Sequence, residues 1–135
     1  MILSGCVANQ YIVPETGPVA SLTYQIKENS KSMEIFVFDD YGCKKPAMIS
    51  SVSNREYAQE LKVTIPANTP FINSYRIHDI LSTDFVTTEF TPKANHNYIV
   101  YIDTSKDLDI RTLERKQDGL SVASSLVKPK KVCKW

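Results

Sequence analysis

The sequence predicts an all-β fold, an antiparallel β-sandwich of about seven to nine short strands. From residue 19 onward, apolar residues recur with a period of about two rather than about 3.6, which is typical of strands with one buried face. Clusters of turn-forming residues separate these short segments. The chain has 135 residues, of which 42% are hydrophobic, so it is long enough for one domain with its own core.

The first expected strand, residues 19–26, shows the pattern most clearly, with four apolar side chains on one face: Ala20, Leu22, Tyr24 and Ile26. The second, residues 33–38, is apolar on both faces at its end, which favours a central strand. The pair Asp118-Gly119 indicates a hairpin turn before the last expected strand. Further strands are expected at residues 61–65, 71–77, 85–90, 98–102, 108–114 and 120–123.

Two details refine the fold prediction. A single helical turn is expected near residues 53–60, because Ser53 and Glu56 have the spacing of a capping box. The stretch from Phe90 through Pro92 to Tyr98 resembles the proline-turn-tyrosine entry to a strand in fibronectin-type and transthyretin-like domains. This resemblance implies an immunoglobulin-like or transthyretin-like sandwich. A small closed β-barrel is the alternative that the strand pattern leaves open.

The first residues point to a cellular address. The run Leu3-Ser4-Gly5-Cys6 resembles the bacterial lipobox, an apolar residue and two small residues before a cysteine that is lipidated. The resemblance implies that residues 1–5 are the remnant of a signal peptide and that Cys6, carrying palmitate-type chains, begins the mature protein. In that family an aspartate after the cysteine retains the protein at the inner membrane, so Val7 favours the outer membrane. The alternative is an ordinary buried cysteine.

Residues 6–18 are expected to form a tether between the lipid and the β-domain of residues 19–135. Two prolines and a glycine between Pro14 and Pro18 exclude a helix there and favour an extended path. The alternative is an edge segment that lies on the domain, because residues 11–13 are apolar.

The other two cysteines, Cys43 and Cys133, are expected to form a disulfide, since an exported chain with an even remainder is typical of one. The bridge would hold the C-terminal end against the body of the domain. The alternative is two free thiols. A metal site is not expected, because the chain has no CxxC motif and its two histidines are far from both cysteines in the sequence.

The charge distribution predicts a basic interaction patch. The net charge is +1, which disfavours a nucleic-acid-binding protein. Beyond Asp118 the chain has no acidic residue, and a bridge between the cysteines would bring the lysines of the tail to those beside Cys43. Such an end could face anionic lipid, an anionic envelope polymer or an acidic protein patch; the alternative is a solubilising tail. The patch comprises Lys44, Lys45, Lys128, Lys130, Lys131 and Lys134.

No catalytic residues and no cofactor are predicted, because the sequence has none of the nucleophile or metalloprotease motifs. His78 and His96 lie in polar contexts that are typical of solvated histidines. The carboxylates of Asp103, Asp107 and Asp109 are spaced closely enough to raise calcium binding, but an acidic loop is the simpler interpretation.

The sequence therefore predicts a non-enzymatic lipoprotein on the periplasmic face of the outer membrane, attached through Cys6. It would be a binding or scaffold domain that contacts an envelope protein. The alternative is a small-ligand or glycan-binding lipoprotein, for which seven tyrosines and one tryptophan supply stacking surfaces. A scaffold should expose an apolar or basic patch and have no deep pocket, and a ligand-binding protein should have a concave site lined by aromatic residues.

Overall fold

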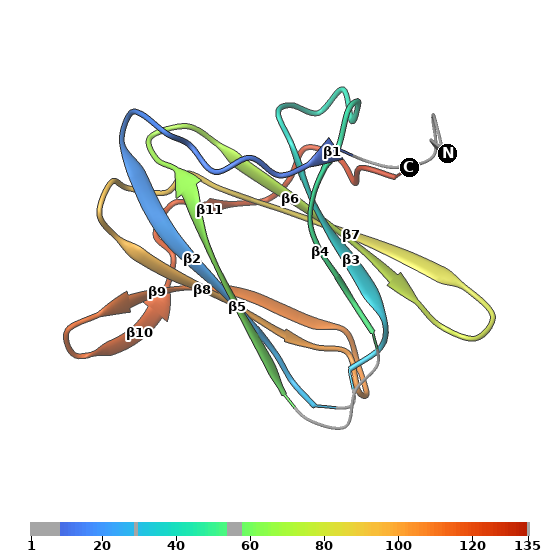
Figure 1. The fold of residues 1–135 in the computed structure, drawn as a ribbon. Coiled ribbons are helices and arrows are strands. Elements are labelled where there is room, and N and C mark those ends of the chain that lie inside the picture. Colours follow the sequence, from blue (N-terminus) through green and yellow to red (C-terminus); the bar gives the residue numbers. More distant parts are fainter. Residues whose placement is uncertain (1–8, 29, 54–57, 135) are drawn as a thin grey trace.

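The computed structural model describes residues 9–28, 30–53 and 58–134, which fold into two packed β-sheets (Figure 1). The strands are β1 (Asn9–Gln10), β2 (Val19–Ile26), β3 (Met33–Phe38), β4 (Ala47–Val52), β5 (Gln59–Pro66), β6 (Phe71–His78), β7 (Thr83–Phe90), β8 (Asn97–Asp103), β9 (Asp109–Lys116), β10 (Gly119–Val122) and β11 (Leu126–Val127).

The six-stranded sheet has the order β1-β4-β3-β6-β7-β11, and the five-stranded sheet has the order β10-β9-β8-β2-β5. The predicted sandwich is confirmed. The strands form two separate sheets with free edges, which excludes the closed barrel. Among the described residues, no helix is long and apolar enough to cross a membrane.

The pairing is mixed rather than purely antiparallel, because β2 pairs with β8 and β1 pairs with β4 in parallel. Strands that follow one another through short turns, such as β6 and β7 or β8 and β9, are antiparallel. The partners in the parallel pairs are far apart in the sequence, so no tight turn dictates their direction. The prediction also missed β4, whose residues are mostly half-exposed and do not alternate.

The core lies between the sheets and is built from the alternating apolar residues. In β2 every second residue is buried, as the period of two predicts. A polar link also joins the layers. The Tyr24 hydroxyl donates to Asn73 Oδ1 at 2.9 Å, and Asn73 Nδ2 donates to the Phe36 carbonyl at 3.1 Å. Because all three residues are buried, this link fixes how the two sheets sit against each other.

A second, smaller apolar cluster covers the outer face of the six-stranded sheet. Its centre consists of Phe36, Phe38, Ile72 and the fully buried Cys133. The Cys133 N–H donates to Thr87 Oγ1 at 2.9 Å, and the Ser74 hydroxyl donates to the Cys133 carbonyl at 3.0 Å. The C-terminal segment is thus hydrogen-bonded to outward-facing side chains of β6 and β7.

The expected helical turn near residues 53–60 is not formed at its C-terminal end, because Gln59 already begins β5; residues 54–57 lie outside the described residues. Residues 1–5 and Cys6 also lie outside them. In the segment between Cys6 and β2, Tyr11 contacts both sheets: its N–H donates to the Met48 carbonyl at 2.9 Å and its hydroxyl to the Thr64 carbonyl at 2.8 Å.

Candidate interaction surfaces

The predicted disulfide is confirmed: Cys43 and Cys133 are bonded, with their Cα atoms 5.4 Å apart and a sequence separation of 90. Cys43 lies in the loop between β3 and β4, where it adopts a φ of 55° and Lys45 a φ of 51°. The bond joins this loop to the C-terminal tail. One end of the sandwich therefore carries residues from two distant parts of the chain.

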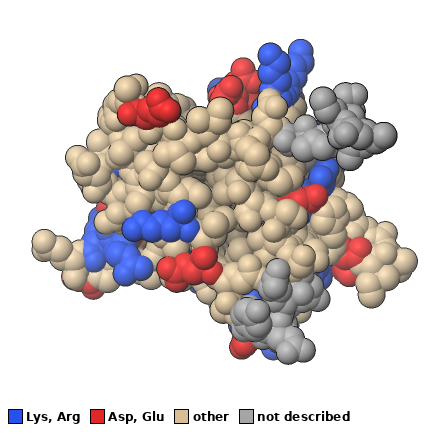
Figure 2. Space-filling model, viewed as in Figure 1, with Lys and Arg blue, Asp and Glu red and all other residues tan. Residues whose placement is uncertain are grey.

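The bridge joins the loop that carries Lys44 and Lys45 to the tail that carries Lys130 and Lys131. Lys130 Nζ lies 6.0 Å from the ring centre of Tyr41, and Lys45 and Lys130 line one groove. All six lysines of the predicted patch are exposed. Acidic residues are interspersed, however: Asp39 and Asp40 are exposed in the same loop. Figure 2 shows acidic side chains directly beside the basic ones over the tip of this loop. The end is mixed in charge, not purely basic.

A groove of about 630 Å³ lies at this end. Its walls are the N-terminal segment with Tyr11, Ile12 and Pro14, the β3–β4 loop with Tyr41, and the turn between β5 and β6. Its size falls in the range of about 300–1,000 Å³ that is typical of small-molecule sites. The sequence named the tyrosines as stacking surfaces but could not place them together, because the residues that line the groove come from segments far apart in the sequence.

The two tyrosines of the groove are hydrogen-bond donors at any physiological pH. Burial raises the pKa of Tyr11 to about 12. Burial and the hydrogen bond to the Glu89 carboxylate raise the pKa of Tyr41 to about 12 as well, and its hydroxyl donates to Glu89 Oε1. Both phenols therefore stay protonated, and the groove offers aromatic faces with a few polar groups.

A different surface lies at the tip of the β6–β7 hairpin, where Ile80 and Leu81 are each 95% exposed. The base of the turn is held by the Asp79 N–H bond to the Ser82 carbonyl at 2.9 Å and by an ion pair between Asp79 and Lys31 at 3.2 Å. Turn positions favour glycine, asparagine, aspartate or proline, so two large apolar residues there do not serve the turn itself. This pair was not among the predicted site residues, although two large apolar residues between Asp79 and Ser82 are unusual for a turn.

The tip and the N-terminal segment lie at different ends of the six-stranded sheet. β1 pairs with the start of β4 at Ala47. Across the sheet, Ala47 lies opposite Val37 of β3, and Val37 lies opposite Asn73 of β6. The tip lies seven residues further along the chain, so it is about 23 Å away at the rise of a strand. In Figure 1 the β6–β7 hairpin extends beyond the rest of the sandwich.

Both histidines have carboxylate partners. Arg76 binds Glu34 through two hydrogen bonds of 2.9 and 2.8 Å, and His78 contacts the same carboxylate. The hydrogen bonds from Arg76 are the main reason why the pKa of Glu34 is lowered. His96 Nδ1 lies 3.3 Å from the nearly buried Glu114. Both histidines therefore lie against carboxylates of neighbouring strands.

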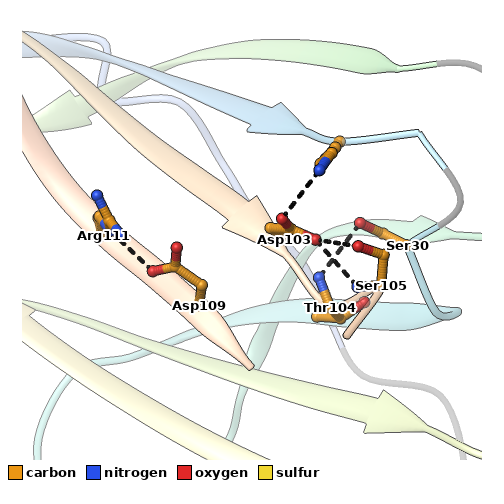
Figure 3. A network of polar contacts seen from close by, with 7 residues as sticks. Ser30, Asp103, Thr104, Ser105, Asp109 and Arg111 are labelled. Atoms are coloured by element: carbon orange, nitrogen blue, oxygen red, sulfur yellow. Dashed lines mark hydrogen bonds and ion pairs between the residues drawn. The ribbon is translucent and has the colours of Figure 1, made fainter. Parts of the chain in front are cut away.

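Asp103 and Asp109, at the two ends of the loop after β8, form hydrogen bonds and ion pairs with neighbouring residues (Figure 3). Asp103 accepts hydrogen bonds from the Ser105 N–H and hydroxyl at 3.0 and 2.6 Å and pairs with Lys27 at 3.3 Å. Asp109 turns to Arg111 instead, at 2.9 Å. Within the described residues, no group of three His, Cys, Asp or Glu side chains could hold a metal ion.

Comparisons with known proteins add no assignment: no protein-family model matches the chain, and no curated protein matches it either. The groove and the tip of the β6–β7 hairpin therefore supply the observations that bear on function.

Proposed function

We propose that the chain is a non-enzymatic, lipid-anchored binding domain on the periplasmic face of the outer membrane, and that it contacts an envelope protein. The observation that supports this most directly is the exposed apolar pair Ile80 and Leu81. Large apolar side chains that are held out into water by a braced turn are typical of contact surfaces between proteins.

The proposed anchor would orient the domain. Asn9 is three positions after Cys6, a span of at most about 11 Å, so the end that carries β1 would lie next to the membrane. The lysines beside the disulfide lie at that end, and each is worth about 1 kcal/mol of attraction when it is close to anionic headgroups. The tip of the β6–β7 hairpin would then point away from the lipid, toward a protein in the periplasm.

A small-ligand or glycan-binding protein is the second candidate, and the groove beside Tyr11 and Tyr41 favours it. Its aromatic walls and the lysines at its rim would suit a sugar or a small anion. The two candidates predict different sensitive residues. Tyr41→Ala should abolish ligand binding but leave a protein contact at the hairpin tip unchanged, and Leu81→Asp should do the opposite.

The anchor is tested by the intact mass of the protein expressed in a bacterium from a reading frame that includes a complete signal peptide. The expected product begins at Cys6, carries acyl chains, fractionates with the outer membrane and is lost in Cys6→Ser. An unlipidated product that retains Met1 would overturn the address.

The protein contact is tested in the same cells with a photoreactive amino acid at Leu81, with Lys106 in the exposed β8–β9 loop as the matched control position. We expect a discrete cross-linked species from Leu81 that Ile80→Asp removes, and none from Lys106. Equal yields from the two positions, or none from either, would contradict the assignment of the tip as a contact surface.

A further inference from the structure

The edge of the five-stranded sheet formed by β10 is open and apolar. β10 pairs only with β9, and its sequence, Gly119-Leu120-Ser121-Val122, contains neither a charge nor a proline. Leu120 and Val122 are 54% and 67% exposed and lie on the same face, since they are two residues apart. An open edge of this kind is a template for pairing with another strand.

Two other edges of the sandwich, β5 and the open part of β7, are protected in ways that β10 lacks. β5, at the opposite edge of the same sheet, carries the exposed charges of Glu60 and Lys62 and ends at Pro66. The part of β7 that β11 leaves open carries the exposed charge of Asp84. Charges and prolines at edges are the usual means of preventing association between sheets. Their absence from β10 sets it apart from β5 and β7.

The backbone hydrogen bonds between β9 and β10 determine which N–H and C=O groups of β10 point away from the sheet. The Ala123 N–H donates to the Thr112 carbonyl of β9. Because backbone groups alternate along an antiparallel pair, Ser121 also points its N–H and C=O toward β9. The N–H and C=O groups of Leu120 and Val122 therefore point outward from the sheet, where the ladder offers them no partner strand.

We propose that β10 pairs with β10 of a second copy of this chain, antiparallel, about a two-fold axis through Ser121. In this register Leu120 lies opposite Val122 of the second copy, and the two exchange both backbone hydrogen bonds. The symmetric pair repeats the arrangement, so every outward group of both residues is used. The two five-stranded sheets then become one continuous sheet.

The side chains favour this register. An apolar row crosses the outer face of the sheet and consists of Ile99 of β8, Leu113 of β9 and Val122. Ile99 is 2% exposed, whereas Val122, at the edge, is 67% exposed. Leu120 of the second copy continues the row across the axis. Isologous contacts of this kind close the assembly as a dimer instead of propagating a fibre.

Ser121 provides an independent indication. Its hydroxyl oxygen is buried and has no hydrogen-bond partner among the described residues. In the proposed pairing the two Ser121 residues face each other at a non-hydrogen-bonded position, where Cα atoms are about 4.5 Å apart. At that separation the two hydroxyls can bond to each other once each side chain rotates toward the edge, and such cross-strand serine and threonine pairs are stabilising.

A pair of four-residue strands buries less than the roughly 800 Å² per partner of a standard interface, so the dimer is weak and depends on concentration. The inference does not depend on the lipid anchor. It is tested on the full chain with Cys6→Ser, and anchoring would only raise the effective concentration.

The test is disulfide trapping in the oxidised protein. Ser121→Cys places two sulfurs within bonding distance across the axis, since bridged Cα atoms are usually about 4.4–6.8 Å apart. The matched control is Ser124→Cys, an exposed position outside the strand. We expect covalent dimer to form at least ten-fold faster from the first variant, and Val122→Asp to remove that advantage.

Amide hydrogen exchange gives a second measurement that needs no added cysteine. The amides of Leu120 and Val122 should become protected as the concentration rises into the millimolar range, while those of β5 should not change. Equal trapping rates for positions 121 and 124, or exchange at Leu120 that does not depend on concentration, would overturn the proposal. So would trapping of position 121 by a different protein but not by a second copy.

Discussion

Removal of the disulfide is the perturbation whose size the structure defines best. The bond between Cys43 and Cys133 closes a loop of 90 residues. The variant replaces both cysteines with alanine, in a chain that also carries Cys6→Ser to prevent thiol exchange. The control is the Cys6→Ser chain with the bridge intact.

The expected loss follows from the loop length. The chain-entropy model gives about 4.6 kcal/mol at 25 °C for a loop of this size. A domain of ordinary stability has about 5–15 kcal/mol in total, so the loss would be between about a third and nearly all of that stability. Part of the loss is local, because Cys133 is fully buried against Phe36, Phe38 and Ile72.

Urea unfolding measures the difference. With an m-value of about 1.5 kcal/mol/M, the midpoint should fall by about 3 M, and m should rise because the unfolded chain is no longer cross-linked. Reduction of the control protein should produce the same shift. A fall of less than about 0.7 M in both experiments would refute the idea that the bridge restrains the unfolded chain.

Three further outcomes are expected. Tyr24→Phe leaves the buried Asn73 Oδ1 without its donor, so the free energy of unfolding should fall by about 1–3 kcal/mol in urea. The hydrogen bonds from Arg76 lower the pKa of Glu34, so the ionised Glu34 stabilises the fold at neutral pH and this stabilisation is lost as the pH falls below about 4.5. The free energy of unfolding of Glu34→Gln should therefore change less over that pH range than that of the unmodified chain. Asn68 adopts a φ of 68°, so Asn68→Val should cost about 1–2 kcal/mol in thermal unfolding, whereas Asn68→Gly should not.

The sequence pattern predicted the features that depend on residues close together in the chain, such as strand position and alternating burial. The alternation in residues 19–26 reappears as the alternating burial of β2, because the side-chain period of a strand is the same in every sheet. β4 escaped the analysis because it lies toward the edge of its sheet, where burial does not impose an alternation. The parallel pairing of β2 with β8 has no local signal, since the two strands are far apart in sequence.

The cysteine count predicted the bridge without any geometry, because two cysteines remain once Cys6 is set aside for the expected lipid, and two cysteines can pair in only one way. From the bridge we also expected the tail lysines to lie near those of the β3–β4 loop, and Lys130 and Lys45 line one groove. The cysteine count did not show that Asp39 and Asp40 share that loop surface, because the folded path of the loop decides which charges stand side by side.

By itself, the sequence determined the fold class, the bridge and the alternation that builds the core, because each follows from residue type and spacing along the chain. Tertiary structure decided where the surfaces lie. The groove is lined by segments that are far apart in the sequence. The exposure of Ile80 and Leu81 depends on how far the β6–β7 hairpin projects, and the open edge at β10 depends on the order of strands in the sheet. Such features arise from contacts between distant residues, which no local pattern encodes.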